Sequence, residues 1–283
     1  MAALELVKRG LACLFSDGLF ATLRKALDYI HPHQRARQKL HADMLSARQK
    51  LHAKVLDEGT AKQRFTAIYK NNLWCSEESL SGPGSNLSYT KNLRKSLPKI
   101  FKKYQIECIL DAPCGDFHWM KEVLKGHHRL RYIGGDIVEE LINKNRASFV
   151  NSNISFEVID ITKDALPPAD LMIVRDCLFH LSYADIDLVL ENLSHSQIKY
   201  LLTTTHIFDS PHVNTDIVTG DFRLIDIFSE PFCFPMYPIE RIDDWLPPDT
   251  PRQMCLFEVA TLPNRTSRRL QARYPQAAAF EDE

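Results

Sequence analysis

Four short apolar segments of the sequence are followed by an acidic residue. The acids are Asp111, Asp136, Asp160 and Asp176. If the segments are parallel strands, their carboxyl ends meet along one edge of a sheet, and open α/β sheets bind ligands at that edge. One acid after one strand is often only a helix cap. Four in succession predict a binding site with strong negative charge.

The turn after the first segment reads "APCGDF" and contains Gly115, where the backbone can approach a ligand without a Cβ atom in the way. A dinucleotide site needs G-x-G-x-x-G, so that a pyrophosphate can sit on a helix N-terminus. This turn lacks those glycines, and Asp116 would repel a phosphate. Asp136, a short distance further along the chain, is suited to ribose hydroxyls. These features predict a phosphate-free, positively charged ribose compound, and S-adenosylmethionine has those properties.

The third and fourth acids extend this predicted site. Asp160 could accept a hydrogen bond from an adenine amino group, with the Ile161 amide nearby. The fourth segment ends in "RDCLFHLS", which would lie beside the reacting methyl group. The complete set predicted to bind the cofactor is Asp111, Ala112, Pro113, Gly115, Asp116, Asp136, Ile137, Asp160, Ile161 and Arg175.

The pattern around these acids predicts an α/β domain. Apolar, β-branched segments alternate with helical patterns near 117–125, 138–149 and 183–193, which favours a parallel sheet covered on both faces. The expected strands are residues 106–112, 131–137, 154–160, 170–176, 199–206 and 255–262.

The chain divides into regions of different character. Residues 1–70 are predicted to form a helical arm, which is basic from residue 31 on and carries "ARQKLHA" twice, at 36–42 and 47–53. Residues 71–99 are predicted to be a connector or lid over the cofactor site, and residues 100–262 the main domain. Within that domain the texture changes after residue 206 to a loop-rich, proline-dense stretch, and residues 263–283 are expected to be a disordered tail.

Composition excludes several classes of protein. The net charge of −1 argues against coating nucleic acid through bulk charge. Seven cysteines without a C-x-x-C pair favour reduced thiols and a cytoplasmic location, and they give no zinc-finger spacing. No apolar run approaches the roughly 20 residues that span a bilayer. Peripheral membrane binding or self-association through residues 1–60 stays open.

The motifs resemble those of class I S-adenosylmethionine-dependent methyltransferases, over roughly residues 100–262. "LDAPCGD" resembles the family's acidic strand end and glycine loop, "YIGGDI" its ribose-binding segment and "FEVIDIT" its adenine-binding segment. From about residue 65 the sequence is also similar to methyltransferases found with bacterial glycan and surface-polysaccharide genes. The resemblance implies a Rossmann-like, mostly parallel seven-stranded sheet with an antiparallel last strand and helices on both faces. It implies that the insert 207–253 within the main domain faces the substrate. It also implies methyl transfer to a sugar or glycan hydroxyl, or to a related small molecule.

Transfer to a hydroxyl requires in-line placement of the acceptor and a general base. The candidates are His180 and His206, as base or acceptor orienter, with Asp176 positioning one of them. Arg223 could bind an acidic acceptor. No metal is predicted. As an alternative, Asp209, His212, Asn214, Asp216 and Asp221 could hold a hard cation near His206.

Three other functions stay open on the sequence alone. The acceptor could be a protein side chain, with the basic arm recruiting the partner. The chain could be a non-catalytic regulatory subunit that binds S-adenosylmethionine. A hydride-transfer Rossmann enzyme is disfavoured by the turn at 112–116.

Overall fold

The computed structural model describes residues 43, 46–57 and 59–263. The chain divides into two compact units, Met1–Lys54 and Val55–Glu283. Residues 46–56 are helical. The first "ARQKLHA" copy, most of the predicted arm and the predicted tail from residue 264 lie outside the described residues. Among the helices that are described, none is both long and apolar enough to cross a membrane.

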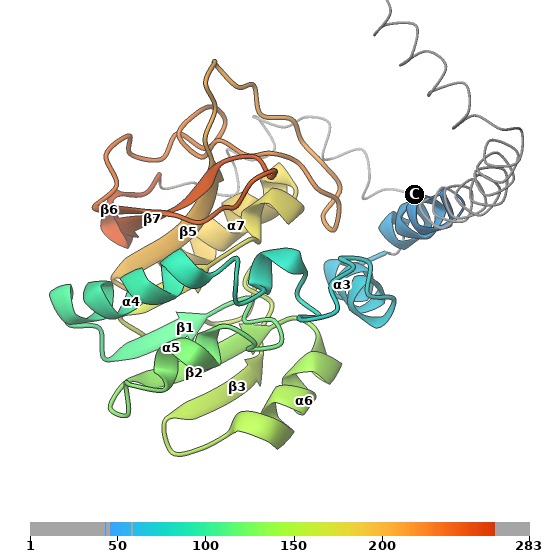
Figure 1. The fold of residues 1–283 in the computed structure, drawn as a ribbon. Helices are drawn as coiled ribbons and strands as arrows, with labels where there is room; N and C mark the ends of the chain where they lie inside the picture. Colours follow the sequence, from blue (N-terminus) through green and yellow to red (C-terminus); the bar gives the residue numbers. More distant parts are fainter. Residues whose placement is uncertain (1–42, 44–45, 58, 264–283) are drawn as a thin grey trace, which may run out of the picture. The chain divides into compact units, whose positions relative to one another are not determined.

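A seven-stranded sheet forms the centre of the larger unit, in the order β3-β2-β1-β4-β5-β7-β6 (Figure 1). Neighbouring strands from β3 to β5 are parallel, whereas β7 is antiparallel to both β5 and β6. The predicted mostly parallel sheet with an antiparallel last strand is therefore confirmed. The strands are β1 Cys108–Asp111, β2 Arg131–Asp136, β3 Ile154–Val158, β4 Leu171–Val174, β5 Tyr200–His206, β6 Glu240–Asp243 and β7 Arg252–Glu258.

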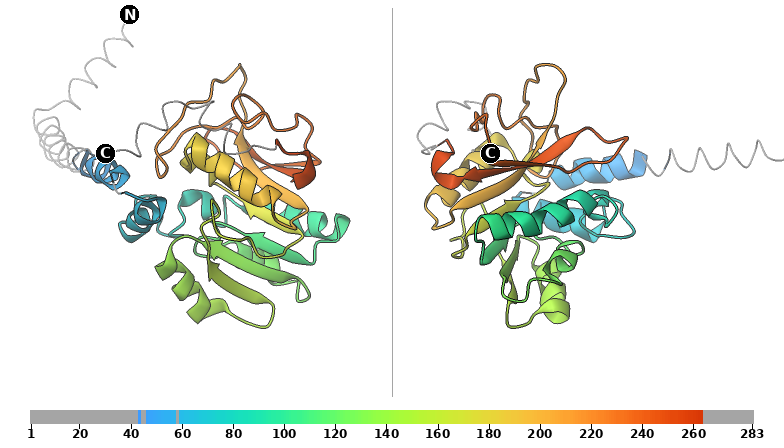
Figure 2. Two further views of the ribbon diagram at one scale, coloured as in Figure 1. Left: turned by 180° about the vertical axis from the view of Figure 1, so that it is seen from behind. Right: turned by 60° about the vertical axis from the view of Figure 1, so that its left-hand side comes forward.

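Helices cover both faces of the sheet because its central strands are apolar on both sides. Ile109 of β1 packs in one core cluster with α4, α5 and α6, and its neighbour Leu110 packs in the other with α7. Helices α4 and α5 lie in front of the sheet in Figure 1, and α7 crosses the opposite face when the molecule is seen from behind (Figure 2). The helices are α3 Ala61–Lys70, α4 Lys91–Lys103, α5 Met120–Leu124, α6 Glu139–Phe149 and α7 Tyr183–Ser194.

Two elements were not expected from the sequence. Helix α4 begins inside the predicted connector 71–99; it buries Leu93, Leu97 and Ile100 at helical spacing although Pro98 lies within it. Strand β6 has only four residues and lies within the segment 207–253. The proline within α4 and the short length of β6 explain why the sequence pattern did not predict these two elements. The short helices are η1 Pro83–Ser85, η2 Leu178–His180 and η3 Val259–Thr261.

Helix α3 belongs to the larger unit, although it falls within the predicted arm 1–70. Its Arg64 side chain donates to the carbonyl oxygens of Leu56 and Thr219, at 3.1 and 3.3 Å. Ile68 packs with Val55 in a small apolar cluster. The segment from residue 55 therefore packs with the sheet domain.

Replacing Leu202 of β5 tests how much the buried side chains of the sheet stabilise the fold. This side chain is fully buried in the middle of the sheet, and Leu202→Ala should lower the free energy of unfolding by about 2–5 kcal/mol because it removes apolar contacts and leaves a cavity. Leu188→Ala on the half-exposed face of α7 is the control and should cost about 0.5 kcal/mol or less. Urea unfolding of both variants is the measurement, and equal losses would contradict this account of the core.

Candidate functional site

The carboxyl ends of the parallel strands meet at one edge of the sheet. The order of the strands changes direction between β1 and β4, which lie side by side: β2 and β3 follow on the side of β1, and β5 follows on the side of β4. Crevices at such a reversal are the usual binding sites of open α/β sheets. Asp111 and Asp136 are the last residues of β1 and β2, while Asp160 and Asp176 follow β3 and β4 by two residues each. The structure thus brings the four predicted acids to one edge.

Asp111 is buried and accepts a hydrogen bond from the Tyr132 hydroxyl at 2.8 Å. Burial raises the pKa of Asp111 to about 7, and the Tyr132 hydrogen bond only partly offsets that effect. Ala112, the next residue, donates its backbone N–H to Ile173 of β4. Asp111, at the end of β1, is therefore fixed between β2 and β4. A nearby positive charge would favour its ionised form.

Asp136 holds the glycine turn directly. Its carboxylate accepts the N–H of Gly115 at 3.2 Å and that of Val138 at 3.0 Å. Burial raises the pKa of Asp136 to about 6 against these two hydrogen bonds. Gly115 has φ +56°, a left-handed conformation that favours glycine. Pro113 and Ile137 flank this contact in the chain, so the predicted ribose-binding acid and the predicted turn form one unit.

The carboxylate of Asp160 mainly binds residues of the turn that follows β3. Its carboxylate accepts the N–H and the hydroxyl of Thr162, at 3.1 and 2.6 Å, and pairs with Lys163 at 3.0 Å. Burial would raise the pKa of Asp160, but these partners outweigh it and lower the pKa. Ile161 is buried beside it. Binding of adenine here stays a prediction.

Asp116 binds the connector loop. Its carboxylate accepts hydrogen bonds from the Ser79 hydroxyl, the Leu80 N–H and the Ser81 hydroxyl, at 2.9, 2.8 and 3.2 Å. A Cβ atom on Gly115 would lie 2.1 Å from Ser81 Oγ, so the loop also requires this glycine. Asp116 was predicted to bind the cofactor; the structure places its carboxylate on residues 79–81.

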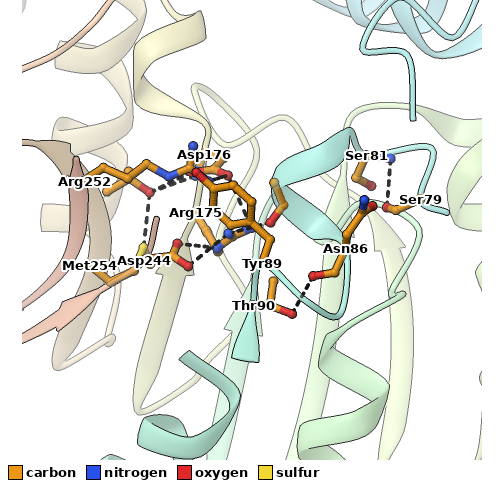
Figure 3. A network of polar contacts seen from close by, with 12 residues as sticks. Ser79, Ser81, Asn86, Tyr89, Thr90, Arg175, Asp176, Asp244, Arg252 and Met254 are labelled. Atoms are coloured by element: carbon orange, nitrogen blue, oxygen red, sulfur yellow. Dashed lines mark hydrogen bonds and ion pairs between the residues drawn. The ribbon is translucent and has the colours of Figure 1, made fainter. Parts of the chain in front are cut away.

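Arg175 joins three segments at the end of β4 (Figure 3). Its Nε and Nη2 donate to the two carboxylate oxygens of Asp244, at 2.7 and 3.2 Å, and Nη2 also donates to the Gly84 carbonyl at 2.7 Å. Burial opposes the charge, but Asp176 and Asp244 raise the pKa of Arg175 above its ordinary value. The predicted cofactor ligand Arg175 is thus engaged with protein groups and anchors the loop at Gly84.

Asp176 lies between two arginines. Its Oδ2 is 2.8 Å from Arg252 Nη2 and 3.3 Å from Arg175 Nη1. Its backbone adopts φ +51°, and its N–H donates to Thr204 Oγ1 at 2.9 Å. Burial works toward a higher pKa, but Arg175 and Arg252 outweigh it and lower the pKa of Asp176. This aspartate therefore stays ionised.

A backbone carbonyl oxygen contacts the ring of one candidate histidine, and a backbone N–H contacts the ring of the other. His180 Nδ1 lies 2.7 Å from the Asp221 carbonyl oxygen, which can only accept, so in the neutral ring Nδ1 carries the proton and Nε2 the lone pair. His206 Nδ1 accepts the Ile225 N–H at 3.1 Å, which leaves the proton on Nε2. Burial lowers the pKa of His206 to about 4. The geometry suits His180 to accept a proton and His206 to donate a hydrogen bond.

Aromatic rings surround these histidines. The His180 ring centroid lies 6.0 Å from Trp74 and 4.6 Å from Phe179, and Phe222 lies 5.8 Å from His180 and 6.5 Å from His206. Phe222 is 54% exposed. The segment that follows β5 therefore contributes an apolar surface beside the candidate base.

The alternative cation site is not assembled in the structure. Asp216 accepts the N–H of Tyr183, and the His212 ring stacks on Phe208 with centroids 3.9 Å apart. Within the described part of the chain, no group of three or more His, Cys, Asp or Glu could hold a metal ion. Arg223, considered for an acidic acceptor, is buried with its guanidinium carbon over the Tyr183 ring at 5.0 Å.

Sequence reasoning missed three side chains of this site. Arg252 is the first residue of β7, Asp244 follows β6, and Tyr89 lies in the connector, where its hydroxyl donates to Asp249 at 3.0 Å. The sequence predicts a strand only from residue 255, which leaves Arg252 in the segment 207–253. Recognising β7 as longer by three residues would have placed Arg252 opposite His206, its Cα partner in β5.

The fold is that of known methyltransferases, at low sequence identity. A SAM-dependent methyltransferase from Leishmania major is 12% identical and aligns over 70% of this chain and 86% of that chain, with a TM-score of 0.53. Human N-acetylserotonin methyltransferase in complex with SAM is 20% identical over 57% of this chain and 49% of that chain (TM-score 0.39). PigF with SAH is 12% identical over 71% and 63%, respectively (TM-score 0.48).

The chain thus spans about half the length of the human protein and less than two thirds of PigF. No protein-family model matches the chain, and no curated protein is significantly similar to it. The likeness to the Leishmania structure, together with the sheet order, shows the Rossmann-like class I methyltransferase fold that the sequence predicted.

The two histidines should be distinguishable by nuclear magnetic resonance. We expect His206 to stay neutral down to a pH of about 4, with its proton on Nε2, because the pKa is lowered by burial and Nδ1 accepts the Ile225 N–H. Neutral His180 should carry its proton on Nδ1. Long-range ¹H–¹⁵N correlation spectra report both tautomers. A protonated His206 ring at pH 6 would contradict this geometry.

Proposed function

We propose that this chain is an S-adenosylmethionine-dependent methyltransferase that methylates a hydroxyl oxygen of a small molecule, most simply a sugar or glycan precursor. The observation that carries the proposal is the pair of buried carboxylates, Asp111 and Asp136, on either side of the Gly115 turn in a class I fold. Two buried acids with raised pKa values are suited to a cationic ligand and disfavour a pyrophosphate. A cytoplasmic location fits the free thiols of the described cysteines.

The residues fit the proposed cofactor without phosphate contacts. Asp136 would hold the ribose hydroxyls, Asp160 and Ile161 the adenine, and the turn from Ala112 to Gly115 the amino-acid part. When bound, S-adenosylmethionine supplies an electrophilic methyl group on a positively charged sulfur. The loop from Ser79 to Ser85, anchored through Asp116 and Arg175, would exclude water from this region.

The acceptor would lie on the side of β4 and β5. His180 takes the hydroxyl proton at Nε2, because Nδ1 is committed to the Asp221 carbonyl. Asp176, kept ionised by two arginines, stabilises the imidazolium that results, and its charge acts on both histidines. His206 donates from Nε2 and orients the acceptor. The segment 207–253 then faces the substrate, with Phe222 as one wall.

Two alternatives make different predictions. A protein side chain as acceptor would give labelled polypeptide when the enzyme, labelled S-adenosylmethionine and fractionated cell extract are combined, whereas the proposed function gives labelled small molecules or glycans. A non-catalytic subunit would bind S-adenosylhomocysteine without labelling any fraction. Mass spectrometry of the labelled material decides between them.

Asp136→Asn should weaken binding of S-adenosylhomocysteine. The ribose would lose a charged acceptor, which is worth about 1.5–3 kcal/mol, or roughly 10- to 100-fold in Kd. Isothermal titration calorimetry measures the change. Glu157→Gln, on the exposed face of neighbouring β3, is the matched control and should leave the Kd unchanged. An unchanged Kd for Asp136→Asn, with a folded variant, would falsify the ribose assignment.

His180→Gln should lower kcat about 10²- to 10⁴-fold, because the variant has no base for the hydroxyl proton. Binding of S-adenosylhomocysteine should be unaffected. The exposed His128→Gln should match the wild type in both measurements. A pH–rate profile adds a second criterion: the rise of kcat/KM through the pKa of a histidine should disappear in His180→Gln. Full activity of this variant would place the base elsewhere.

A further inference from the structure

We infer that Arg252 binds a negatively charged group of the methyl acceptor, so that the acceptor is an acidic hydroxyl compound, a sugar acid or sugar phosphate in the simplest case. This inference rests on the proposed function, because it assigns the acceptor of the same site.

Arg252 stands on the acceptor side of the sheet edge. It is the Cα partner of His206 across β5 and β7, and its Nη2 reaches Asp176. The sheet order separates β7 from β2 and β3, whose acids are proposed to bind the cofactor. The sulfonium and ammonium groups of the proposed cofactor are attracted to the acids of β1 and β2, and its carboxylate belongs to the amino-acid part, which is proposed to lie on the turn from Ala112 to Gly115. The charge of Arg252 therefore suits the second substrate.

Within the part of the chain that the structure describes, the buried Nε donor of Arg252 has no hydrogen-bond partner. An arginine offers five N–H groups, and Arg252 Nη2 donates to Asp176 Oδ2 at 2.8 Å. Nε is buried and has no hydrogen-bond partner within the described residues. Asp176 does not form the two-pronged pair that would satisfy Nε, since its Oδ1 lies 3.4 Å from Thr204 Oγ1 instead. Because buried polar groups are almost always paired, this donor points to a ligand.

The guanidinium is already held in place. It lies over the Tyr89 ring, 4.7 Å from its centroid, and its side chain is 11% exposed. A Cβ atom on Gly84 would come within 2.9 Å of both Arg252 Nη2 and Asp176 Oδ2, so the loop backbone passes directly beside this ion pair (Figure 3). A donor fixed before binding loses little conformational entropy when the ligand arrives.

Arg175 and Arg223 are also buried arginines of the described residues, but they are less suited to this role. Arg175 uses its donors on Asp244 and Gly84. Nε and Nη1 of Arg223 also lack a hydrogen-bond partner among the described residues. However, its guanidinium lies over the rings of Tyr183 and Phe232, which belong to the core cluster, so an anion would have to displace core side chains.

The ligand chemistry is an oxyanion, either a carboxylate or a phosphate. A guanidinium presents adjacent N–H groups in one plane and binds both groups well. Asp176 and Asp244 already balance the charges of Arg252 and Arg175, so the anion would be bound through the N–H donors that Arg252 does not use on Asp176, above all Nε. The nucleophilic hydroxyl of such an acceptor would then lie on the side of His206, the strand neighbour of Arg252.

Calorimetry on the full chain saturated with S-adenosylhomocysteine tests the inference. The probes are D-glucuronate, D-glucose 6-phosphate and neutral D-glucose. We expect at least one anionic probe to bind about tenfold or more tightly than glucose, a factor that corresponds to about 1.4 kcal/mol. Binding of glucuronate alone identifies a carboxylate, and binding of glucose 6-phosphate alone a phosphate.

Arg252→Gln should lose this preference for the anion while it keeps its affinity for S-adenosylhomocysteine. Arg241→Gln removes an exposed arginine on β6 and is the matched control, which should keep the preference. If Arg252→Gln does not fold, Arg252→Lys serves instead, since it preserves a charge beside Asp176 but lacks the Nε–H. It should also lose the preference.

Three results would overturn the inference: no anion preference in the wild type, an unchanged preference in the Arg252 variants, or equal loss of anion and S-adenosylhomocysteine binding. The last result would assign Arg252 to the cofactor. Failure of the wild type to bind S-adenosylhomocysteine at all is a different outcome, because it contradicts the proposed function itself and this inference with it.

Discussion

The buried guanidinium of Arg175 connects the parts of the site. It joins the end of β4, the loop after β6 and the connector at Gly84, and each contact is a charge-assisted hydrogen bond of 2.7–3.2 Å. Such a group is stable in the interior only when its charge and its donors are matched. The positions of the connector loop, Asp176 and Asp244 therefore depend on one another through Arg175.

The connector is bound at two points by charges of opposite sign. Asp116 accepts from residues 79–81, and Arg175 donates to Gly84. Both glycines involved are required by contact: a side chain at Gly115 would strike Ser81, and one at Gly84 would strike Arg252 and Asp176. The glycine turn at Gly115 thus has two explanations, the approach of a ligand and the approach of the protein's own loop.

The sequence was sufficient to predict the sheet and the acids at its edge, because buried parallel strands are continuously apolar and an aspartate at such a strand end is conspicuous. Asp111 and Asp136 were identified in this way. The role of Asp116 could not be predicted, because its partners lie 35 to 37 residues earlier in the chain. Arg252 was missed for a related reason: it reaches the site only through antiparallel pairing of β7 with β5.

The charges of Arg175 and Arg252 also explain why Asp176 and His180 have different roles in the proposed mechanism. Arg175 and Arg252 stabilise the carboxylate of Asp176, and a carboxylate that is stabilised in this way is a weak base. It still favours a positive charge on a neighbouring imidazole. His206 is buried beside Arg252, and both its burial and this arginine disfavour its protonation. Its Nδ1 lone pair is also occupied by the Ile225 N–H. We therefore propose His180, whose Nδ1 is held by the Asp221 carbonyl, as the group at this edge that accepts the proton.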